Sequence, residues 1–225
     1  GRPVSNPWGY QNTLYFEELN YHGERWGWGV VPDQYALGRG LQALHASPGG
    51  PNFLMFTGVS THAPWDKIPE FRQDWESFGR NPEGTKDSSG VWRKLMSKLS
   101  GQKSSCVSLS CYQDAIEQEW LVLADFMEQV SSPAALFVVV GDHQPPIVST
   151  QDSHVPIHFI ARGVEGLPRL ESIGFVEGMT AQDGQPVSHA GLFSLLVSLL
   201  ESTDNELSKI YVADGVSPSG LLRNE

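Results

Sequence analysis

A continuous apolar run that ends in a carboxylate and an imidazole constrains the fold of this chain more than any other segment. The run covers residues 134–140, and Gly141, Asp142 and His143 follow it directly. An apolar run without polar alternation is typical of a strand that is covered on both faces of a parallel sheet. Ligands bind beyond the carboxyl ends of such strands. The sequence therefore predicts an α/β fold with a mostly parallel sheet, and a site at Asp142 and His143.

Asp142 and His143 are suited to bind a divalent cation. A carboxylate and an imidazole together favour zinc or manganese rather than calcium. Gly141 lets the chain turn sharply, and Pro145 and Pro146 prevent a helix from following at once. The alternative is that Asp142 caps a turn and that His143 is an ordinary loop histidine.

Two further strand-like segments carry histidines. Residues 52–59 are apolar and lead to His62, and residues 154–161 form a third predicted strand with His154 at its entry. Strand periodicity places His154 and His158 on one face, and we expect His158 to be structural. Because the runs end at equivalent points, we expect His62 to lie within about 15 Å of Asp142, in one ligand pocket.

The remaining secondary structure follows from apolar spacing. Helical periodicity predicts helices over residues 32–44, 113–129 and 189–201, with the apolar side of the second at Ile116, Trp120, Leu123, Phe126, Met127 and Val130. Residues 66–105 are predicted to be a loop-rich insertion with a short helix at 91–99. We expect loop and a short strand within 163–185, and a last strand at 209–213. The prediction is a single domain over residues 1–225.

The composition limits the classes of partner. The chain has 26 acidic and 15 basic residues and a net charge of −11, which argues against nucleic-acid binding. No stretch approaches the roughly 20 consecutive apolar residues of a membrane span. An anionic substrate would need local compensation of this charge. Cys106 and Cys111 are five positions apart, which permits either a small disulfide loop or two buried thiols.

The opening of the chain is rich in aromatic residues, which admits two interpretations. The rings could line a site for a sugar or a lipid headgroup, or they could pack in the core. The residues concerned are Trp8, Tyr10, Tyr15, Phe16, Tyr21, Trp26 and Trp28.

Taken in order, these segments resemble the carboxyl-terminal half of the catalytic domain of the alkaline phosphatase superfamily. The resemblance is to the sulfatase-like branch, which includes lipoteichoic acid synthases and phosphoethanolamine transferases, and it runs from about residue 20 to residue 200. The segments that carry it are Trp26–Leu37, Ser60–Trp65, Tyr112–Gln129, Gly141–His143, His154–Pro156 and Ser188–Leu196.

The resemblance implies a fold and a set of roles. The fold is a three-layer α/β sandwich with a mostly parallel central sheet, here lacking its amino-terminal portion. The activity is that of a metal-dependent hydrolase or transferase acting on phosphate or sulfate esters, including extracytoplasmic lipid or glycan substrates. The implied roles are catalysis at the leaving group for His62, cation binding for Asp142, His143 and His189, and substrate binding for His154, Arg25 and His22.

The resemblance also implies an extracytoplasmic location, a membrane-anchored parent and a Cys106–Cys111 disulfide. Two family features are missing, namely an acidic ligand at an upstream strand end and a nucleophile at a helix start. Cys106 lacks the Cys-x-Pro-x-Arg context of the sulfatase nucleophile. We therefore expect a fragment that is poorly active alone. The alternative is an inactive sulfatase-like domain that serves as a binding module, and the upstream sequence of the parent gene would discriminate between the two.

Overall fold

The computed structural model describes residues 9–47, 49–80, 106–148, 154–164, 167–179 and 186–201. The chain divides into two compact units, Gly1–Ser131 with Pro145–Ser149, and Ser132–Gln144 with Thr150–Glu225. The predicted helix at 91–99 and the predicted strand at 209–213 lie outside the described residues, and the prediction of a single domain stays a prediction.

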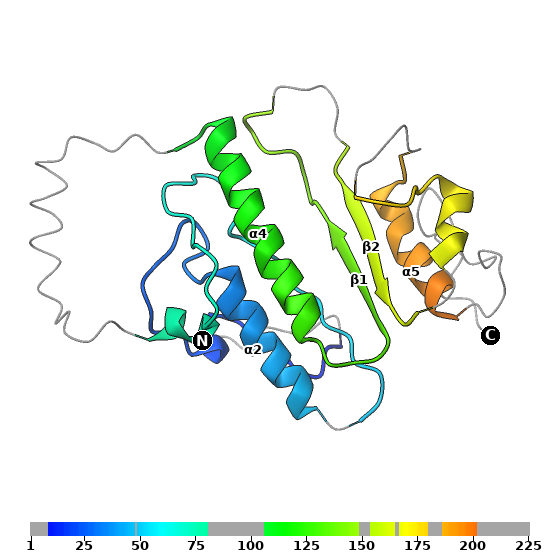
Figure 1. Ribbon diagram of the computed structural model, residues 1–225, viewed down its shortest axis with the longest axis horizontal. Helices are drawn as coiled ribbons and strands as arrows, with labels where there is room; N and C mark the ends of the chain where they lie inside the picture. Colours follow the sequence, from blue (N-terminus) through cyan, green and yellow to red (C-terminus); the bar gives the residue numbers. More distant parts are fainter. Residues whose placement is uncertain are drawn as a thin grey trace, which may run out of the picture. The chain divides into compact units, whose positions relative to one another are not determined.

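The two long helices of the first unit, α2 (Asp33–Ala46) and α4 (Leu109–Gln129), lie side by side (Figure 1). The other elements of this unit are α1 (Phe16–Leu19) and the 3-10 helix η1 (Trp75–Gly79). The predicted helix at residues 32–44 is confirmed as α2. It begins after Pro32, which stands at the N-cap with a φ of −60° that suits a helix start. The core of this unit is a mainly aromatic cluster that includes residues of α2. The buried members are Leu19, Tyr21, Val31, Tyr35 and Phe78, and Trp26, Ala36 and Trp75 pack against them.

Helix α4 is confirmed, but it begins four residues earlier than predicted. Ser108 caps it, since its Oγ accepts a hydrogen bond from the amide of Cys111 at 3.3 Å. The deeply buried positions are Ala115 and Val122, one step around the helix from the predicted apolar side, which is only half-buried. The face of α4 that reaches the core of this unit therefore differs from the predicted one.

Cys106 and Cys111 are joined by a disulfide. The amide of Trp65 donates to the carbonyl of Cys106 at 2.9 Å, and the Asp66 carboxylate accepts from the amide of Cys106. The disulfide thus links the first turn of α4 to the residue that holds segment 65–66.

The predicted strand at residues 52–59 does not form. This segment runs as irregular chain, and the side chains of Phe53 and Met55 are 71% and 65% exposed. β-propensity produces a strand only where a neighbouring strand pairs with it, and no described strand does so here. The sequence pattern was strand-like, but it carried no information about a partner.

The second unit contains a two-stranded antiparallel sheet, which corrects the predicted fold. Strand β1 (Ala135–Val140) pairs with β2 (Ile157–Arg162), with Ala135 opposite Arg162 and Val140 opposite Ile157 (Figure 1). This is the only sheet among the described residues, so the three-layer sandwich with a mostly parallel sheet is wrong for that part of the chain. A parallel return needs a crossover, usually a helix, and the described part of this connection has none. Both strands are half-buried rather than covered on two faces.

The rest of the second unit consists of short helices, namely η2 (Leu167–Ile173), η3 (His189–Gly191) and α5 (Leu192–Glu201). Where the pattern predicted loop and a short strand after residue 163, the structure has η2. The predicted helix at 189–201 is present as η3 followed by α5. Ser188 caps it as predicted, because its Oγ accepts from the amide of Ala190 at 3.3 Å. None of the described helices combines the length and the apolar character needed to cross a bilayer.

Candidate functional site

Asp142 and His143 lie just past the carboxyl end of β1, as the sequence predicts. The amide of Gly141 donates to the carbonyl of Pro156 at 3.1 Å, which fixes the start of the loop. The side chains of Asp142 and His143 are 87% and 64% exposed, and Asp142 Oδ2 lies 3.5 Å from His143 Nε2. Asp142 Oδ1 accepts from the amide of His143 at 2.9 Å. The carboxylate is therefore oriented with Oδ2 toward the imidazole.

The hydrogen bonds of His143 decide which ring nitrogen is free to bind a ligand. Nδ1 lies 2.9 Å from the carbonyl oxygen of Gln144. A carbonyl only accepts, so Nδ1 carries the proton and Nε2 of the neutral ring has a lone pair. Nε2 and Asp142 Oδ2 are then two acceptors that face each other. Their lone pairs repel unless a proton or a cation lies between them. Two ligands at about 2.0–2.2 Å from tetrahedral zinc lie roughly 3.4 Å apart, so the donor set fits such an ion.

His189 and His154 lie near the same strand end but do not complete a metal site. Nε2 of His189 is 3.2 Å from the carbonyl oxygen of Gly141, and the carbonyl of His154 accepts from the side-chain amide of Gln144. The described residues contain no group of three or more His, Cys, Asp or Glu side chains arranged around a metal position. Asp142 and His143 are thus the two adjacent donors that the structure brings together.

His62 belongs to the first unit, where its ring is held from two sides. Nδ1 lies 2.6 Å from the carbonyl oxygen of Ala63, and the ring stacks on Trp28 with centroids 4.2 Å apart. By the argument used for His143, Nδ1 carries the proton and Nε2 is the accepting nitrogen of the neutral ring. That His62 and Asp142 share one pocket stays a prediction.

Some aromatic residues of the opening pack in the core, and another is exposed beside His62. Trp26 and Tyr21 pack in the core, whereas Trp28 is 59% exposed beside His62. A pocket there is lined by Trp26, Trp28, His62, Pro64 and Lys67, among others.

The two other candidates from this region, His22 and Arg25, are exposed. The ring of His22 is 2.9 Å from the side chain of Asn20. The carbonyl of Arg25 accepts from Lys67, whose ammonium also pairs with Glu24. Their predicted role in substrate binding stays a prediction.

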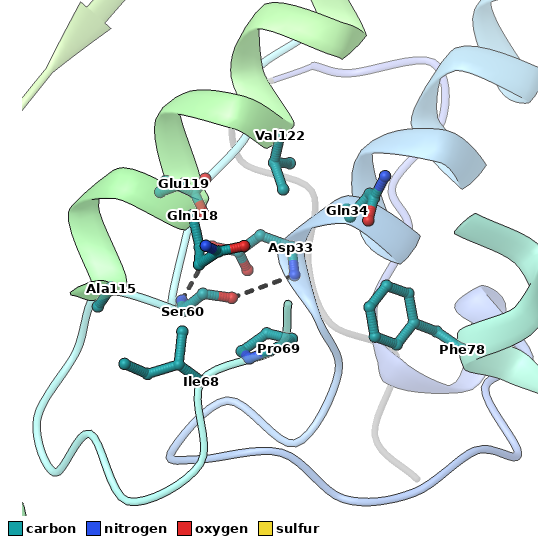
Figure 2. Close-up of a pocket in the computed structure, with 10 residues that line it drawn as sticks. All are labelled: Asp33, Gln34, Ser60, Ile68, Pro69, Phe78, Ala115, Gln118, Glu119 and Val122. Atoms are coloured by element: carbon teal, nitrogen blue, oxygen red, sulfur yellow. Dashed lines mark hydrogen bonds between the residues drawn. The ribbon is translucent and has the colours of Figure 1, made fainter. Parts of the chain in front are cut away.

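A second pocket of the first unit holds a carboxyl pair that the sequence did not predict, with Asp33 buried and Glu119 half-buried (Figure 2). Asp33 in the first turn of α2 is 2% exposed, and its carboxyl group hydrogen-bonds to that of Glu119 on α4. Burial raises the pKa of Asp33 to about 6, although hydrogen bonds from Ser60 and Val59 lower it. Burial and the nearby Asp33 raise the pKa of Glu119 well above its ordinary value.

One signal in the sequence pointed to this pair. Glu119 lies four residues after Ala115 and three before Val122, so it shares their helix face. A carboxylate between two core positions requires a partner.

Comparison of the chain with protein-family models, curated proteins and solved structures finds no match.

Proposed function

We propose that this chain is part of a metal-dependent hydrolase or transferase that acts on phosphate or sulfate esters. The observation that carries the proposal is the pair of facing acceptors, Asp142 Oδ2 and His143 Nε2, 3.5 Å apart on an exposed loop at a strand end. An imidazole whose second nitrogen donates to a backbone carbonyl is the usual state of a metal-binding histidine. The cation would be zinc or manganese, and the resemblance of the surrounding segments to the sulfatase-like branch indicates the class of substrate.

The roles in this proposal follow from the chemistry of each side chain. Asp142 and His143 hold the cation, which, when bound, neutralises negative charge on the ester oxygens. In the second unit, His189 is proposed as a further cation ligand and His154 as a contact to the ester. In the first unit, His62 presents Nε2, a nitrogen suited to exchange a proton with the leaving group of an ester. The predicted roles of His22 and Arg25 in substrate binding stay predictions. An acidic chain of net charge −11 repels anions, so local positive charge is a requirement of the proposal.

The disulfide supports one further part of the proposal. Disulfides persist in oxidising compartments, so the Cys106–Cys111 bond favours an extracytoplasmic location. Together with the resemblance, we propose that the parent protein is anchored at the outer face of a membrane.

The proposal predicts slow, cation-dependent ester cleavage. The chain is mixed with Zn²⁺ or Mn²⁺ and with p-nitrophenyl phosphate or p-nitrophenyl sulfate, and release of nitrophenol is followed. We expect turnover of one ester, its loss with a chelator, and a drop of about tenfold or more in His143→Gln because one of two cation ligands is removed.

The matched control is His45→Gln, which changes an exposed histidine at the end of α2 and should leave turnover unchanged. Turnover that resists both the chelator and His143→Gln would contradict the proposal. Cation binding without turnover of either ester would favour the binding module instead.

A further inference from the structure

The turn that carries His62 is held by Asp33. Oδ2 of Asp33 accepts hydrogen bonds from the amides of Val59 at 2.7 Å and Ser60 at 2.9 Å. Ser60 Oγ in return accepts from the amide of Asp33 at 3.2 Å, as Figure 2 shows. The amide of His62 then donates to the carbonyl of Val59 at 3.0 Å. The position of one buried carboxylate therefore fixes the backbone from which His62 projects.

Glu119 in turn holds Asp33. Two carboxyl groups hydrogen-bond to each other only when one of them carries a proton. Oδ2 of Asp33 already accepts two amides, so Glu119 is the donor and Asp33 the anion. The fit is tight, because a Cβ atom placed on Gly58 would lie 2.9 Å from Asp33 Oδ2 and 3.6 Å from Glu119 Oε1. The turn, α2 and α4 thus meet at this pair.

We infer that Asp33 and Glu119 are positioning residues for His62, and that the proton they share makes the placement of this imidazole depend on pH. The inference depends on the proposed function only for the chemical role of His62. The placement of the ring is a property of the first unit and can be measured without any cation or substrate.

No charged side chain that lines the pocket compensates a second negative charge. Apart from Asp33 and Glu119, the lining residues on α2, α4, η1 and segment 60–69 are uncharged, namely Gln34, Ser60, Ile68, Pro69, Phe78, Ala115, Gln118 and Val122. The guanidinium of Arg72 lies over the Phe78 ring, 4.0 Å from its centroid, and Arg72 does not line the pocket. When Glu119 loses its proton, two facing anions therefore repel each other in a site of low dielectric.

The pKa values set the direction of the effect. Burial raises the pKa of Glu119 well above its ordinary value, while the amides of Val59 and Ser60 favour the anion at Asp33, so Asp33 ionises first and the pair stays intact until Glu119 loses its proton. As the pH rises through the raised pKa of Glu119, the hydrogen bond is lost and the turn is released. His62 then leaves its stacked position on Trp28.

The test follows the ring protons of His62 by NMR in the full chain, with His62→Gln used to assign them. The Trp28 ring shifts these protons upfield while the two rings are stacked. In a titration toward high pH we expect, besides the protonation step of the ring itself, a second step at which the upfield shift is lost. Glu119→Gln keeps the donor but cannot ionise, so it should retain the upfield shift and lack the second step.

Two further variants sharpen the result. Glu119→Leu removes the donor, and it should show a reduced upfield shift at every pH. Glu117→Gln changes an exposed carboxylate on the same helix and should titrate like the unsubstituted chain. The inference is overturned if the second step persists in Glu119→Gln, or if Glu119→Leu leaves the His62 signals unchanged. Neither outcome bears on cation binding at Asp142 and His143, so the two proposals fail separately.

Discussion

Replacement of Asp33 by alanine is expected to lower the free energy of unfolding by about 3–5 kcal/mol at pH 6. The substitution leaves the amides of Val59 and Ser60 without their acceptor and the Glu119 carboxyl without its partner. These groups belong to half-buried residues, and such a group costs about 1–3 kcal/mol when it is left unsatisfied. Urea denaturation followed by tryptophan fluorescence measures the loss.

The pH dependence of this penalty has a defined sign. The pKa of Asp33 is raised from 3.8 to about 6, and that of Glu119 is raised above 4.5. Between the unfolded and the folded pKa of each group, the folded chain therefore binds more protons than the unfolded chain. The contribution of this pair to the free energy of unfolding is therefore fully present below about pH 4, and it is lost as the pH rises through 6 and above. The penalty of Asp33→Ala should shrink between pH 5 and pH 8.

The control for Asp33→Ala is Asp114→Ala, which removes an exposed carboxylate of α4. It should change stability by less than about 0.5 kcal/mol. A penalty at Asp33 no larger than this, or one that grows with rising pH, would contradict the description of the pair.

Two glycines of α2 should respond to alanine with opposite signs. A Cβ on Gly38 would lie 2.4 Å from the Trp75 ring, whereas a Cβ on Gly40 would lie 3.5 Å from Leu54, in ordinary contact. Alanine in a helix interior gains about 1 kcal/mol over glycine, but overpacking a core costs about 1–3 kcal/mol. We expect Gly40→Ala to stabilise the chain by up to about 1 kcal/mol and Gly38→Ala to destabilise it by about 1–2 kcal/mol.

Thermal unfolding of the two variants side by side measures this difference. The Trp75 ring is also packed edge-on against Tyr35, with centroids 5.5 Å apart, so it cannot yield without disturbing the core. Equal stability of Gly38→Ala and Gly40→Ala would show that η1 is not packed against α2 as described.

Local features of the chain were predictable, because they depend on residues close in sequence. Pro32 before Asp33 located the start of α2, and Ser188 located the cap of the last helix. The apolar run to Val140 located β1 and placed Asp142 and His143 at its end. At the two helix starts, interactions within a few residues decide the outcome.

Features that depend on distant partners were not predictable in the same way. The apolar runs at 52–59 and 135–140 look alike, yet only the second finds a strand to pair with, and that strand runs antiparallel. Periodicity reports which side chains avoid water, but not which neighbour covers them or in which direction it runs.

The Asp33–Glu119 pair shows the same limit at the level of a site. These residues are 86 positions apart, and they meet because α2 and α4 pack together. Asp33 alone is typical of an acidic first-turn residue. The position of Glu119 between Ala115 and Val122 indicates that it needs a partner, but not which residue that partner is. The consequence for His62 follows only from the contacts that Asp33 makes with both α4 and the 59–62 turn.

A zinc titration of the full 225-residue chain by calorimetry, with the His143 ring followed by NMR, tests whether Asp142 and His143 bind a cation. We expect weak binding of one Zn²⁺, because two protein ligands leave the ion largely hydrated, and we expect the His143 ring signals to shift during the titration. Asp142→Asn and His143→Gln should each weaken binding by about tenfold or more, while His45→Gln should bind as the unsubstituted chain does. Unchanged zinc affinity in both Asp142→Asn and His143→Gln would contradict the assignment of the cation site to the end of β1.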